Sequence, residues 1–409
     1  MRFLFLTQYF PPEIGAPQVR LASMARELVR LGHEVEVVTG LPNHPTGRIF
    51  REYRGKFAVT EEWEGIRVHR TWLYAATGAG WRRMLNYGSF AATSLWGLLK
   101  SKRPDYVFVE SPPLFLSVPA WLMCVAWRRP FIFNVADLWP DSVRELGLMD
   151  EGVTLRVAEW LEGWSYGRAA FVNAVTEGIR DDLHRKKNVP GRKLLFLPNG
   201  VDTELFQPRE PELELARSLG LEGKLVVLYA GTLGFAQGLD VALHAMRELA
   251  TTHADARLVF IGDGSDRARL EGVASQLKLE NVMFLPPNTP EYVARLYSFA
   301  VAGFASLKDL PLFEGARPSK IFPIMGSGRP VLYSGSGEGA RLVQAADAGL
   351  VTPPEDSHAL TAALRTLLDD GTRAREMGAN GRAYVERELS WGALVADWLR
   401  QLQDARLRH

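Results

Sequence analysis

Short apolar runs recur along the chain, and the segments between them repeat their apolar residues at helical spacing. Each run is long enough for one strand buried on both faces. In the first half, strands are expected at residues 3–6, 35–39, 66–69, 106–109, 131–135, 171–175 and 194–197. Because strands that alternate with helices form a parallel sheet covered on both faces, this half is predicted to be one doubly wound α/β domain.

The alternation starts again after a charged stretch at residues 207–214, which we interpret as a linker. The strands expected in the second half lie at residues 225–229, 257–261, 282–284, 301–304 and 331–333. The fold class is therefore α/β, with two Rossmann-like, doubly wound domains at residues 1–203 and 204–385.

The C-terminal segment, residues 386–409, contains one continuous apolar stripe. Its members are spaced at i, i+3, i+4, i+7, i+8 and i+11, and they are Trp391, Leu394, Val395, Trp398, Leu399 and Leu402. Ser390 is placed to cap the helix. Because such a stripe must be buried, the helix is predicted to cross back and pack on the first domain.

The strand at residues 225–229 is followed by Gly231, Gly234 and Gly238, and a helical pattern begins at Leu239. A buried strand, a glycine turn and a helix start leave free backbone N–H groups that suit an anion such as phosphate. The spacing does not fit the dinucleotide fingerprint. The alternative interpretation is an ordinary tight turn between a strand and a helix.

Composition limits the classes of function. The 409 residues exceed one ordinary core, and the net charge of +1 gives no global field for nucleic acid, so no nucleic-acid partner is expected. The single cysteine, Cys124, excludes a disulfide framework and a cysteine metal cluster. Neither a signal-peptide core nor an apolar run of membrane-spanning length is present, so a cytoplasmic location is expected.

Seven motifs lie in the order found in a known family. They are Leu6-Thr-Gln-Tyr-Phe-Pro-Pro-Glu-Ile-Gly-Ala-Pro17, Leu41-Pro-Asn-His-Pro-Thr-Gly-Arg48, Glu110-Ser-Pro-Pro113, Asp137-Leu-Trp-Pro-Asp141, Leu197-Pro-Asn-Gly-Val-Asp202, Tyr229-Ala-Gly231 with Gly234, and Pro318-Ser-Lys-Ile-Phe322. In this ordered set the chain resembles the retaining glycosyltransferases of family four, which have the GT-B fold. Within them it is similar to bacterial O-antigen and capsule transferases of N-acetyl-fucosamine type.

The resemblance implies a nucleotide-sugar donor, UDP-linked by analogy, held mainly by the second domain in a cleft between the domains. It implies an acceptor held mainly by the first domain, and transfer that retains the anomeric configuration without a metal or other cofactor. Relatives of this kind extend sugars on a lipid-linked carrier in cell-surface polysaccharide synthesis. The expected partners are therefore a UDP-sugar and a lipid-linked saccharide, at the inner membrane face.

Several site residues follow from the matched motifs. Gly15 matches the family's glycine that approaches the diphosphate from the first domain, and Arg20 on the next helix could add a positive charge. The alternatives are a plain turn glycine and an arginine on a solvated helix face. In the second domain, Gly231, Thr232 and Gly234 match the phosphate-facing turn.

Most relatives have a basic pair at the positions of Thr232 and Gln237. This chain has no basic residue at either position, so the cation that faces the diphosphate must come from elsewhere. Lys320 is the candidate for catalysis and donor binding, and Arg317 is the second choice. The sequence predicts Lys320 in the first turn of a helix capped by Ser319, where a cation is unfavourable unless an anion neutralises it. The alternative is a surface lysine.

The chain departs from the family at two positions. Pro323 replaces the usual glutamate that holds the donor ribose, and Glu314 is the candidate to substitute for the missing acid pair. Ala136 replaces a histidine close to the transferred sugar, which leaves Asp137 as the candidate catalytic or sugar-contacting residue, or a helix cap. A non-catalytic sugar-nucleotide binder and a GT-B sugar-nucleotide epimerase therefore stay open as alternatives.

Basic and aromatic residues are mixed in two segments of the first domain, at residues 48–57 and 81–99. This mixture suits anionic lipid headgroups, so a peripheral contact with an anionic membrane surface is expected. The alternative for the second segment is a half-buried helix with a few exposed arginines. His44 is a further candidate for the acceptor site, against a purely structural role.

Overall fold

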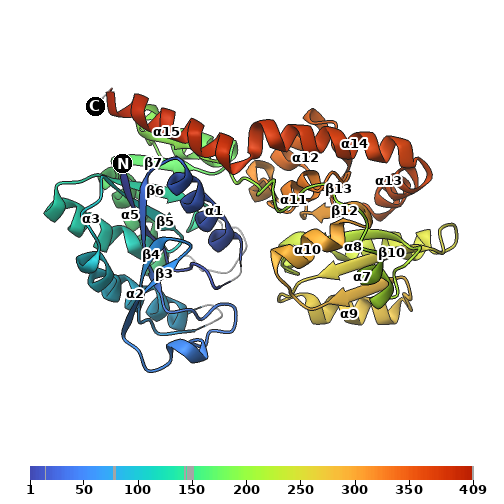
Figure 1. The fold of residues 1–409 in the computed structure, drawn as a ribbon, viewed down its shortest axis with the longest axis horizontal. Coiled ribbons are helices and arrows are strands. Elements are labelled where there is room, and N and C mark those ends of the chain that lie inside the picture. Colours follow the sequence, from blue (N-terminus) through green and yellow to red (C-terminus); the bar gives the residue numbers. More distant parts are fainter. Residues whose placement is uncertain (14, 77–79, 142–143, 145–151, 408–409) are drawn as a thin grey trace. The chain divides into compact units, whose positions relative to one another are not determined.

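The computed structural model describes residues 1–13, 15–76, 80–141, 144 and 152–407. The chain divides into two compact units (Figure 1). The first unit consists of residues 1–199 together with 394–409, and the second of residues 200–393. Each unit has a central sheet with helices on both faces, so the predicted α/β fold class is confirmed.

The sheet of the first unit has eight strands in the order β3-β4-β2-β1-β5-β6-β7-β8. The strands are β1 (Arg2–Leu6), β2 (Glu34–Gly40), β3 (Ala58–Trp63), β4 (Ile66–Thr71), β5 (Tyr106–Ser111), β6 (Phe131–Val135), β7 (Phe171–Ala174) and β8 (Leu194–Phe196). All neighbours pair in parallel except β3 and β4, which are antiparallel.

The helices that cover this sheet are α1 (Ala16–Arg30), α2 (Trp81–Lys100), α3 (Ser117–Trp127), α5 (Val153–Arg168), α6 (Glu177–Arg185) and α15 (Trp391–Leu407). Short 3-10 turns are η1 (Arg51–Tyr53), η2 (Leu114–Leu116) and η3 (Gly191–Lys193). Side chains of α2, α3 and α5 share one apolar cluster with Leu4, Leu6 and Val107 of the sheet. These three helices therefore cover the same face of the sheet.

The second unit has six parallel strands in the order β11-β10-β9-β12-β13-β14. They are β9 (Leu225–Ala230), β10 (Ala256–Ile261), β11 (Val282–Leu285), β12 (Ala300–Ser306), β13 (Val331–Ser334) and β14 (Gly349–Thr352). The helices are α7 (Leu213–Ser218), α8 (Asp240–Leu249), α9 (Arg267–Gln276), α10 (Pro290–Tyr297), α11 (Ile321–Gly326), α12 (Gly337–Ala345), α13 (Ser357–Asp369) and α14 (Gly371–Tyr384). Shorter turns are η4 (Phe235–Gln237), η5 (Pro311–Gly315) and the π-helical η6 (Val385–Leu389).

Every strand expected from the sequence is present, with ends within two residues of the predicted ones. The strands β3 and β14 were not predicted. In β3 every residue is exposed or half-buried, so its sequence lacks the apolar run of a central strand. The predicted linker overlaps the start of α7.

The C-terminal helix α15 packs on the first unit, as predicted. The indole of Trp398 is fully buried, with its ring 5.8 Å from that of Phe3 and 5.9 Å from that of Phe108. Gln401 donates to the Phe196 carbonyl (3.0 Å) and accepts from the Phe196 amide (2.9 Å), which extends the edge of the sheet. At the start of the helix, Ser390 Oγ accepts from the Ala393 amide (3.4 Å).

Candidate active site

Strand order identifies where each sheet can bind a ligand. In the second unit β9 lies between β10 and β12. The chain runs from β9 outward through β10 to β11, and then from β12 outward through β13 to β14 on the other side. Ligands of doubly wound sheets bind outside the carboxyl ends of the strands at such a switch point. The turn with Gly231 follows β9, and the segment that leads to Lys320 follows β12, so both predicted donor elements flank this point.

Gly231 and Lys320 are in direct contact. A Cβ atom at position 231 would lie 2.6 Å from Lys320 Cε and 3.4 Å from its Nζ, so the lysine chain passes directly over the glycine. Gly231 also has φ +138°, a conformation that favours glycine. The structure therefore gives a physical reason for glycine at this position, beyond that of an ordinary turn.

The ammonium group of Lys320 makes no ion pair or hydrogen bond with a described residue, and it lies 5.5 Å from the centre of the Tyr229 ring. Burial lowers the pKa of Lys320 from 10.5 to about 8, because desolvation disfavours the charged form. A cation held without a carboxylate over a glycine turn is an arrangement that an anion would stabilise. The alternative of a surface lysine does not fit this half-buried side chain.

The predicted helical context of Lys320 was wrong in detail. Lys320 is the N-cap of α11, one position before its first turn, and no side chain caps this helix. Ser319 is exposed, and the turn is closed by the Ile321 amide, which donates to the Pro318 carbonyl (3.2 Å).

In the turn after β9, most backbone groups are already bonded. The Gly231 amide donates to Ile261 (2.9 Å), the Leu233 amide donates to Asp263 (2.9 Å), and the Gly234 amide donates to Gln237 Oε1 (3.1 Å). The Tyr229 hydroxyl donates to the Thr232 carbonyl (2.6 Å). The Thr232 amide has no hydrogen-bond partner among the described residues, so it is one N–H group of this turn that an anion can engage.

Arg317 and Glu314 both pair with α12. Arg317 forms an ion pair with the buried Glu338 in the first turn of α12, and Glu314 forms an exposed ion pair with Arg341 (3.0 Å). Sequence reasoning missed Glu338, although a glycine on each side of it after an apolar strand was a usable signal. The structure therefore groups Lys320 with Gly231 and Thr232, and Arg317 and Glu314 with α12.

In the first unit, Gly15 is the N-cap of α1, in the loop that follows β1 at the β1/β5 switch point. Its φ of 173° is extended backbone that any residue adopts. A Cβ atom there would lie 2.5 Å from Oε1 of Gln18, a buried atom without a described partner. The Gln18 side chain therefore lies close over Gly15, and a larger residue at this position would displace that side chain.

Arg20 is 8% exposed, so the alternative of a solvated helix face is wrong. Its Nη2 donates to Glu110 Oε1 in a buried ion pair, and its Nη1 donates to Asn199 Oδ1 (3.1 Å). Burial raises the pKa of Glu110, while Arg20 and Asn134 act in the opposite direction. Arg20 therefore joins α1 to β5 and to the Pro-Asn-Gly turn.

The same carboxylate begins a buried chain of hydrogen bonds across the sheet. Asn134 Nδ2 donates to Glu110 Oε2 (2.7 Å), and Asn173 Nδ2 donates to Asn134 Oδ1 (2.7 Å). Trp398 Nε1 donates to Asn173 Oδ1 (3.1 Å). Because an indole N–H can only donate, it fixes the orientation of both amides, and each then donates toward Glu110.

Asp137 follows β6 and is exposed. Its carbonyl accepts from the Trp139 amide (2.9 Å), and it makes at least one further interaction with the surrounding chain. The alternative role of a helix cap depends on residues 142–151, most of which lie outside the described ranges. The structure places Asp137 beside the carboxyl end of the sheet, two strands from β1.

A buried carboxylate that sequence reasoning did not single out organises the loop after β2. Glu13 Oε1 accepts from the Asn43 and His44 amides (both 2.8 Å), and burial raises the pKa of Glu13 to about 7. His44 lines a pocket of about 240 Å³ with Tyr9 and Arg83, which fits its candidate role. Burial lowers the pKa of His44, because desolvation disfavours the charged ring, and the nearby Arg83 acts in the same direction.

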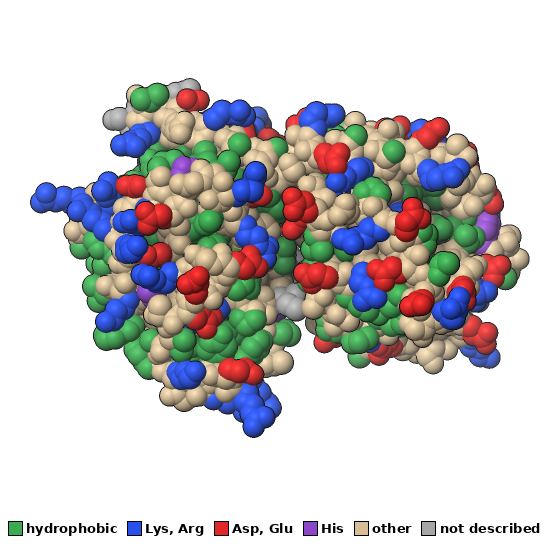
Figure 2. All heavy atoms as spheres, in the orientation of Figure 1, with side chains coloured by type: hydrophobic (Ala, Val, Ile, Leu, Met, Phe, Trp, Pro, Cys, Tyr) green, Lys and Arg blue, Asp and Glu red, His purple; other side chains and the backbone are tan. Residues whose placement is uncertain are grey.

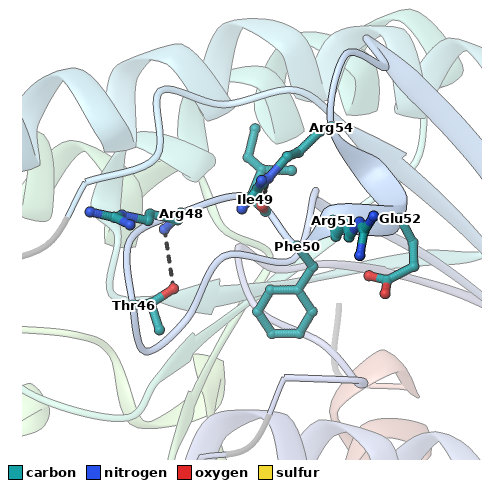
Figure 3. Close-up of a pocket in the computed structure, with 7 residues that line it drawn as sticks. All are labelled: Thr46, Arg48, Ile49, Phe50, Arg51, Glu52 and Arg54. Atoms are coloured by element: carbon teal, nitrogen blue, oxygen red, sulfur yellow. Dashed lines mark hydrogen bonds between the residues drawn. The ribbon is translucent and has the colours of Figure 1, made fainter.

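The continuation of this loop lines a second, open pocket of about 700 Å³ (Figure 3). Its lining residues are Thr46, Arg48, Ile49, Phe50, Arg51, Glu52 and Arg54. Arg54 is held by the Ile49 carbonyl (3.1 Å), while the side chain of Arg48 extends away from the loop (Figure 3). Among the described residues, no group of three His, Cys, Asp or Glu side chains is placed to hold a metal ion.

Comparison with known families agrees with this geometry. Residues 15–200 match the glycosyl transferase 4-like domain, and residues 212–384 match glycosyl transferases group 1. The chain is 26% identical over 405 residues to the putative colanic acid biosynthesis glycosyl transferase WcaI of Escherichia coli, covering 95% of this chain and 96% of that protein. It is 29% identical over 419 residues to a GDP-mannose-dependent phosphatidylinositol monomannoside mannosyltransferase of Mycolicibacterium smegmatis, covering 98% and 99%.

Solved structures of low sequence identity share the fold. Sucrose-phosphate synthase of Thermosynechococcus elongatus superposes with a TM-score of 0.78 at 19% identity, covering all of both chains. Anabaena HepE in complex with UDP and glucose superposes with a TM-score of 0.73 at 18% identity, covering 99% of this chain and all of that one. With a glycosyltransferase domain matched in each half, the chain is a glycosyltransferase of the GT-B fold, composed of a glycosyl transferase 4-like domain and a group 1 domain.

Proposed function

We propose that the protein transfers a sugar from a uridine diphosphate sugar to a lipid-linked saccharide, with retention and without a metal, in cell-surface polysaccharide synthesis. The single observation that supports this most is the Lys320 ammonium, held over Gly231 without a counter-ion among the described residues. The donor diphosphate is the anion of the proposed reaction.

The chemistry requires stabilisation of a leaving group. As the bond from the sugar to the diphosphate breaks, negative charge grows on the phosphate oxygens. Lys320 supplies a partly desolvated cation, and the Thr232 amide supplies a fixed dipole at the carboxyl end of β9. We assign donor binding to Gly231, Thr232, Gly234 and Lys320. Arg317 and Glu314 are also assigned to the donor site, where their ion pairs join it to α12.

For the first unit we propose that Gly15 contacts the diphosphate, with Arg20 fixing α1 behind it. Asp137 is proposed to contact the transferred sugar or the acceptor. The acceptor is proposed to bind this unit, where the loop after β2 lines both pockets. A lipid acceptor is supported by the name of the mycobacterial relative, whose substrate is a phosphatidylinositol mannoside.

The names of the similar proteins give two different nucleotides. The mannosyltransferase relative is GDP-mannose-dependent, whereas Anabaena HepE was solved with UDP and with UDP-glucose. We propose uridine on the family resemblance.

Calorimetric titration of uridine, guanosine and adenosine diphosphates tests the site. The wild-type chain is compared with Lys320→Ala and with the control Lys224→Ala, whose lysine lies before the amino end of the same strand and pairs with Asp255 (2.5 Å). We expect Lys320→Ala to weaken uridine diphosphate binding by about tenfold to a hundredfold, as for a lost charge-assisted contact, and Lys224→Ala to leave it unchanged. Equal binding by both variants contradicts the role of Lys320.

Two other outcomes have distinct meanings. Preference for guanosine diphosphate would support the proposed position of the donor site and would change the nucleotide of the donor from uridine to guanosine. Absence of binding by all three nucleotides would contradict the donor assignment and favour a protein without transferase activity.

A further inference from the structure

Large apolar side chains point outward on three helices of the first unit. Of the eighteen exposed large hydrophobic side chains among the described residues, ten belong to α2, α3 and α5, and only two belong to the second unit. We call this set the apolar face, and its members are Trp81, Leu85, Trp96, Leu99, Val118, Leu122, Val125, Val153, Val157 and Trp160. Trp160 is 65% exposed and Leu122 is 46% exposed.

The residues of the apolar face form one stripe on each helix. On α3 the outward residues are spaced at i, i+4 and i+7, and on α5 the spacing is the same. On α2 the outward stripe runs from Trp81 to Leu99 over five turns, with Gly88 and Ala92 between its large members. Each helix therefore has an apolar side turned toward solvent in addition to its core side.

The three stripes belong to one layer. The inner sides of α2, α3 and α5 share one core cluster on the same face of the sheet, and α3 packs against both α2 and α5. Their outer sides are therefore neighbours. Figure 2 shows hydrophobic side chains gathered over the part of this unit where α2 and α3 lie in Figure 1. A helix that is apolar on both sides needs a second apolar environment.

Among the described residues of α2, α3 and α5, the charged side chains that make no ion pair are all basic. No Asp or Glu occurs in α2 or α3. Of the two acids on α5, Glu162 is buried and bonded to Lys187 (2.8 Å), and Glu159 lies 3.4 Å from Arg144. Five basic residues in or directly after these helices make no ion pair with a described residue. They are Arg82, Lys100, Arg128, Arg156 and Arg168.

We propose that the apolar face docks on the surface of an anionic lipid bilayer. Tryptophan, aliphatic and basic side chains on helices that lie in one layer are typical of proteins that lie in the interface of a membrane. None of the described helices is long and apolar enough to cross a bilayer. The assignment rests on the proposed function, because a lipid-linked acceptor must be met at a membrane.

Charge distinguishes this partner from a second copy of the chain. A symmetric dimer through the apolar face would bring the same surface of both copies together. The arginine and lysine side chains that make no ion pair would then face the same positive side chains of the other copy, and like charges repel. Anionic lipid headgroups instead neutralise these charges while the tryptophans enter the headgroup region.

Flotation of the full chain with lipid vesicles tests the proposal. Vesicles of phosphatidylcholine alone are compared with vesicles of equal parts phosphatidylcholine and phosphatidylglycerol. The double variant Leu122→Ser/Trp160→Ser removes apolar side chains, and Lys100→Glu/Arg156→Glu reverses two charges. The control Leu213→Ser removes a similarly exposed leucine (56%) from α7 of the second unit.

We expect the wild type and the control to float with the anionic vesicles and to be released at high salt, because the charge attraction is screened. The apolar variant should lose partitioning by about tenfold or more, and the charge variant by more than about fivefold per removed charge. Binding of nucleoside diphosphate should be unchanged in all variants. Failure of nucleotide binding with intact flotation would therefore contradict the proposed function and not the membrane contact.

Three results would overturn the inference. Equal flotation with neutral and anionic vesicles would remove the charge argument. Equal flotation of the apolar variant and the control would place the contact on another surface. Sedimentation of the wild type as a dimer that the apolar substitutions dissociate, without flotation, would show that a second copy covers the apolar face.

Discussion

At the scale of single residues, the charge on Lys320 depends on pH. The side chain is held over Gly231 and has no described counter-ion, and desolvation lowers its pKa to about 8. The folded protein therefore binds this proton less tightly than the unfolded chain does, and the buried charge opposes folding at neutral pH. That cost diminishes as the pH rises from about 8 toward 10.5, where the lysine of the folded state is neutral.

The same titration predicts how nucleotide binding changes with pH. A bound diphosphate stabilises the ammonium and raises the pKa of Lys320, so affinity should fall as the pH rises through about 8, by at most about tenfold per unit. Lys320→Arg keeps its charge throughout this range and should show a flatter profile. Titration of uridine diphosphate between neutral pH and about one unit above that pKa measures both. Parallel profiles for the two proteins would contradict the assignment.

Sequence reasoning found the pair Gly231 and Lys320 through matched motifs, but it could not give their contact. The distance between them depends on how the segments after β9 and β12 fold over the switch point. Glu13 and Glu338 were missed for a related reason. Each looks like an ordinary charged loop or helix residue, and only burial against backbone amides or against Arg317 makes it distinctive.

At the scale of elements, hydrophobic periodicity predicted the central strands well because both faces of a parallel sheet are buried. It failed for β3, an antiparallel edge strand that has no buried residue and carries two adjacent glutamates. Buried polar residues inside strands were also invisible to it. Asn134 and Asn173 interrupt apolar runs, yet they link β5, β6, β7 and α15 by hydrogen bonds.

The direction of this hydrogen-bond chain can be tested. Glu110 accepts from both Arg20 and Asn134, whereas Glu110→Gln has one acceptor and would turn its NH₂ group toward another donor. We expect this substitution to destabilise the protein by about 3 kcal/mol. If Trp398→Phe is added, the fixed donor is lost and both asparagine amides can rotate, so the glutamine NH₂ group finds an acceptor.

The expected result is a coupling free energy of about 1–3 kcal/mol between Glu110→Gln and Trp398→Phe, measured by denaturant unfolding. The double variant should be more stable than the sum of the single effects predicts. Trp121→Phe, a half-buried tryptophan outside the hydrogen-bond chain, serves as the control and should combine additively with Glu110→Gln. Additive behaviour of both tryptophan variants would show that Trp398 does not set the amide orientations.

At the scale of the whole molecule, the order of elements along the chain differs from their order in space. The first unit is completed by residues 394–409, which are synthesised after all of the second unit. Because the C-terminal stripe is strictly apolar at helical spacing, its burial could be predicted from the sequence. Its hydrogen bonds to Asn173 and Phe196 could not, since they depend on which polar groups the sheet presents at that position.

This arrangement predicts an unequal effect of C-terminal truncation. Ending the chain after Ala393 removes Trp398, Leu399 and Leu402, which are 0%, 7% and 1% exposed, and leaves the second unit complete. Loss of one buried tryptophan alone costs about 3–5 kcal/mol, a large part of the stability of a domain. Calorimetry should therefore show the melting transition of the first unit lost or strongly lowered, with the second transition retained. Equal loss of both transitions would show that the units fold as one. Nucleotide binding measured on the same truncated chain tests the second unit separately. If that unit binds a nucleoside diphosphate through Lys320, weak binding should survive without a folded first unit.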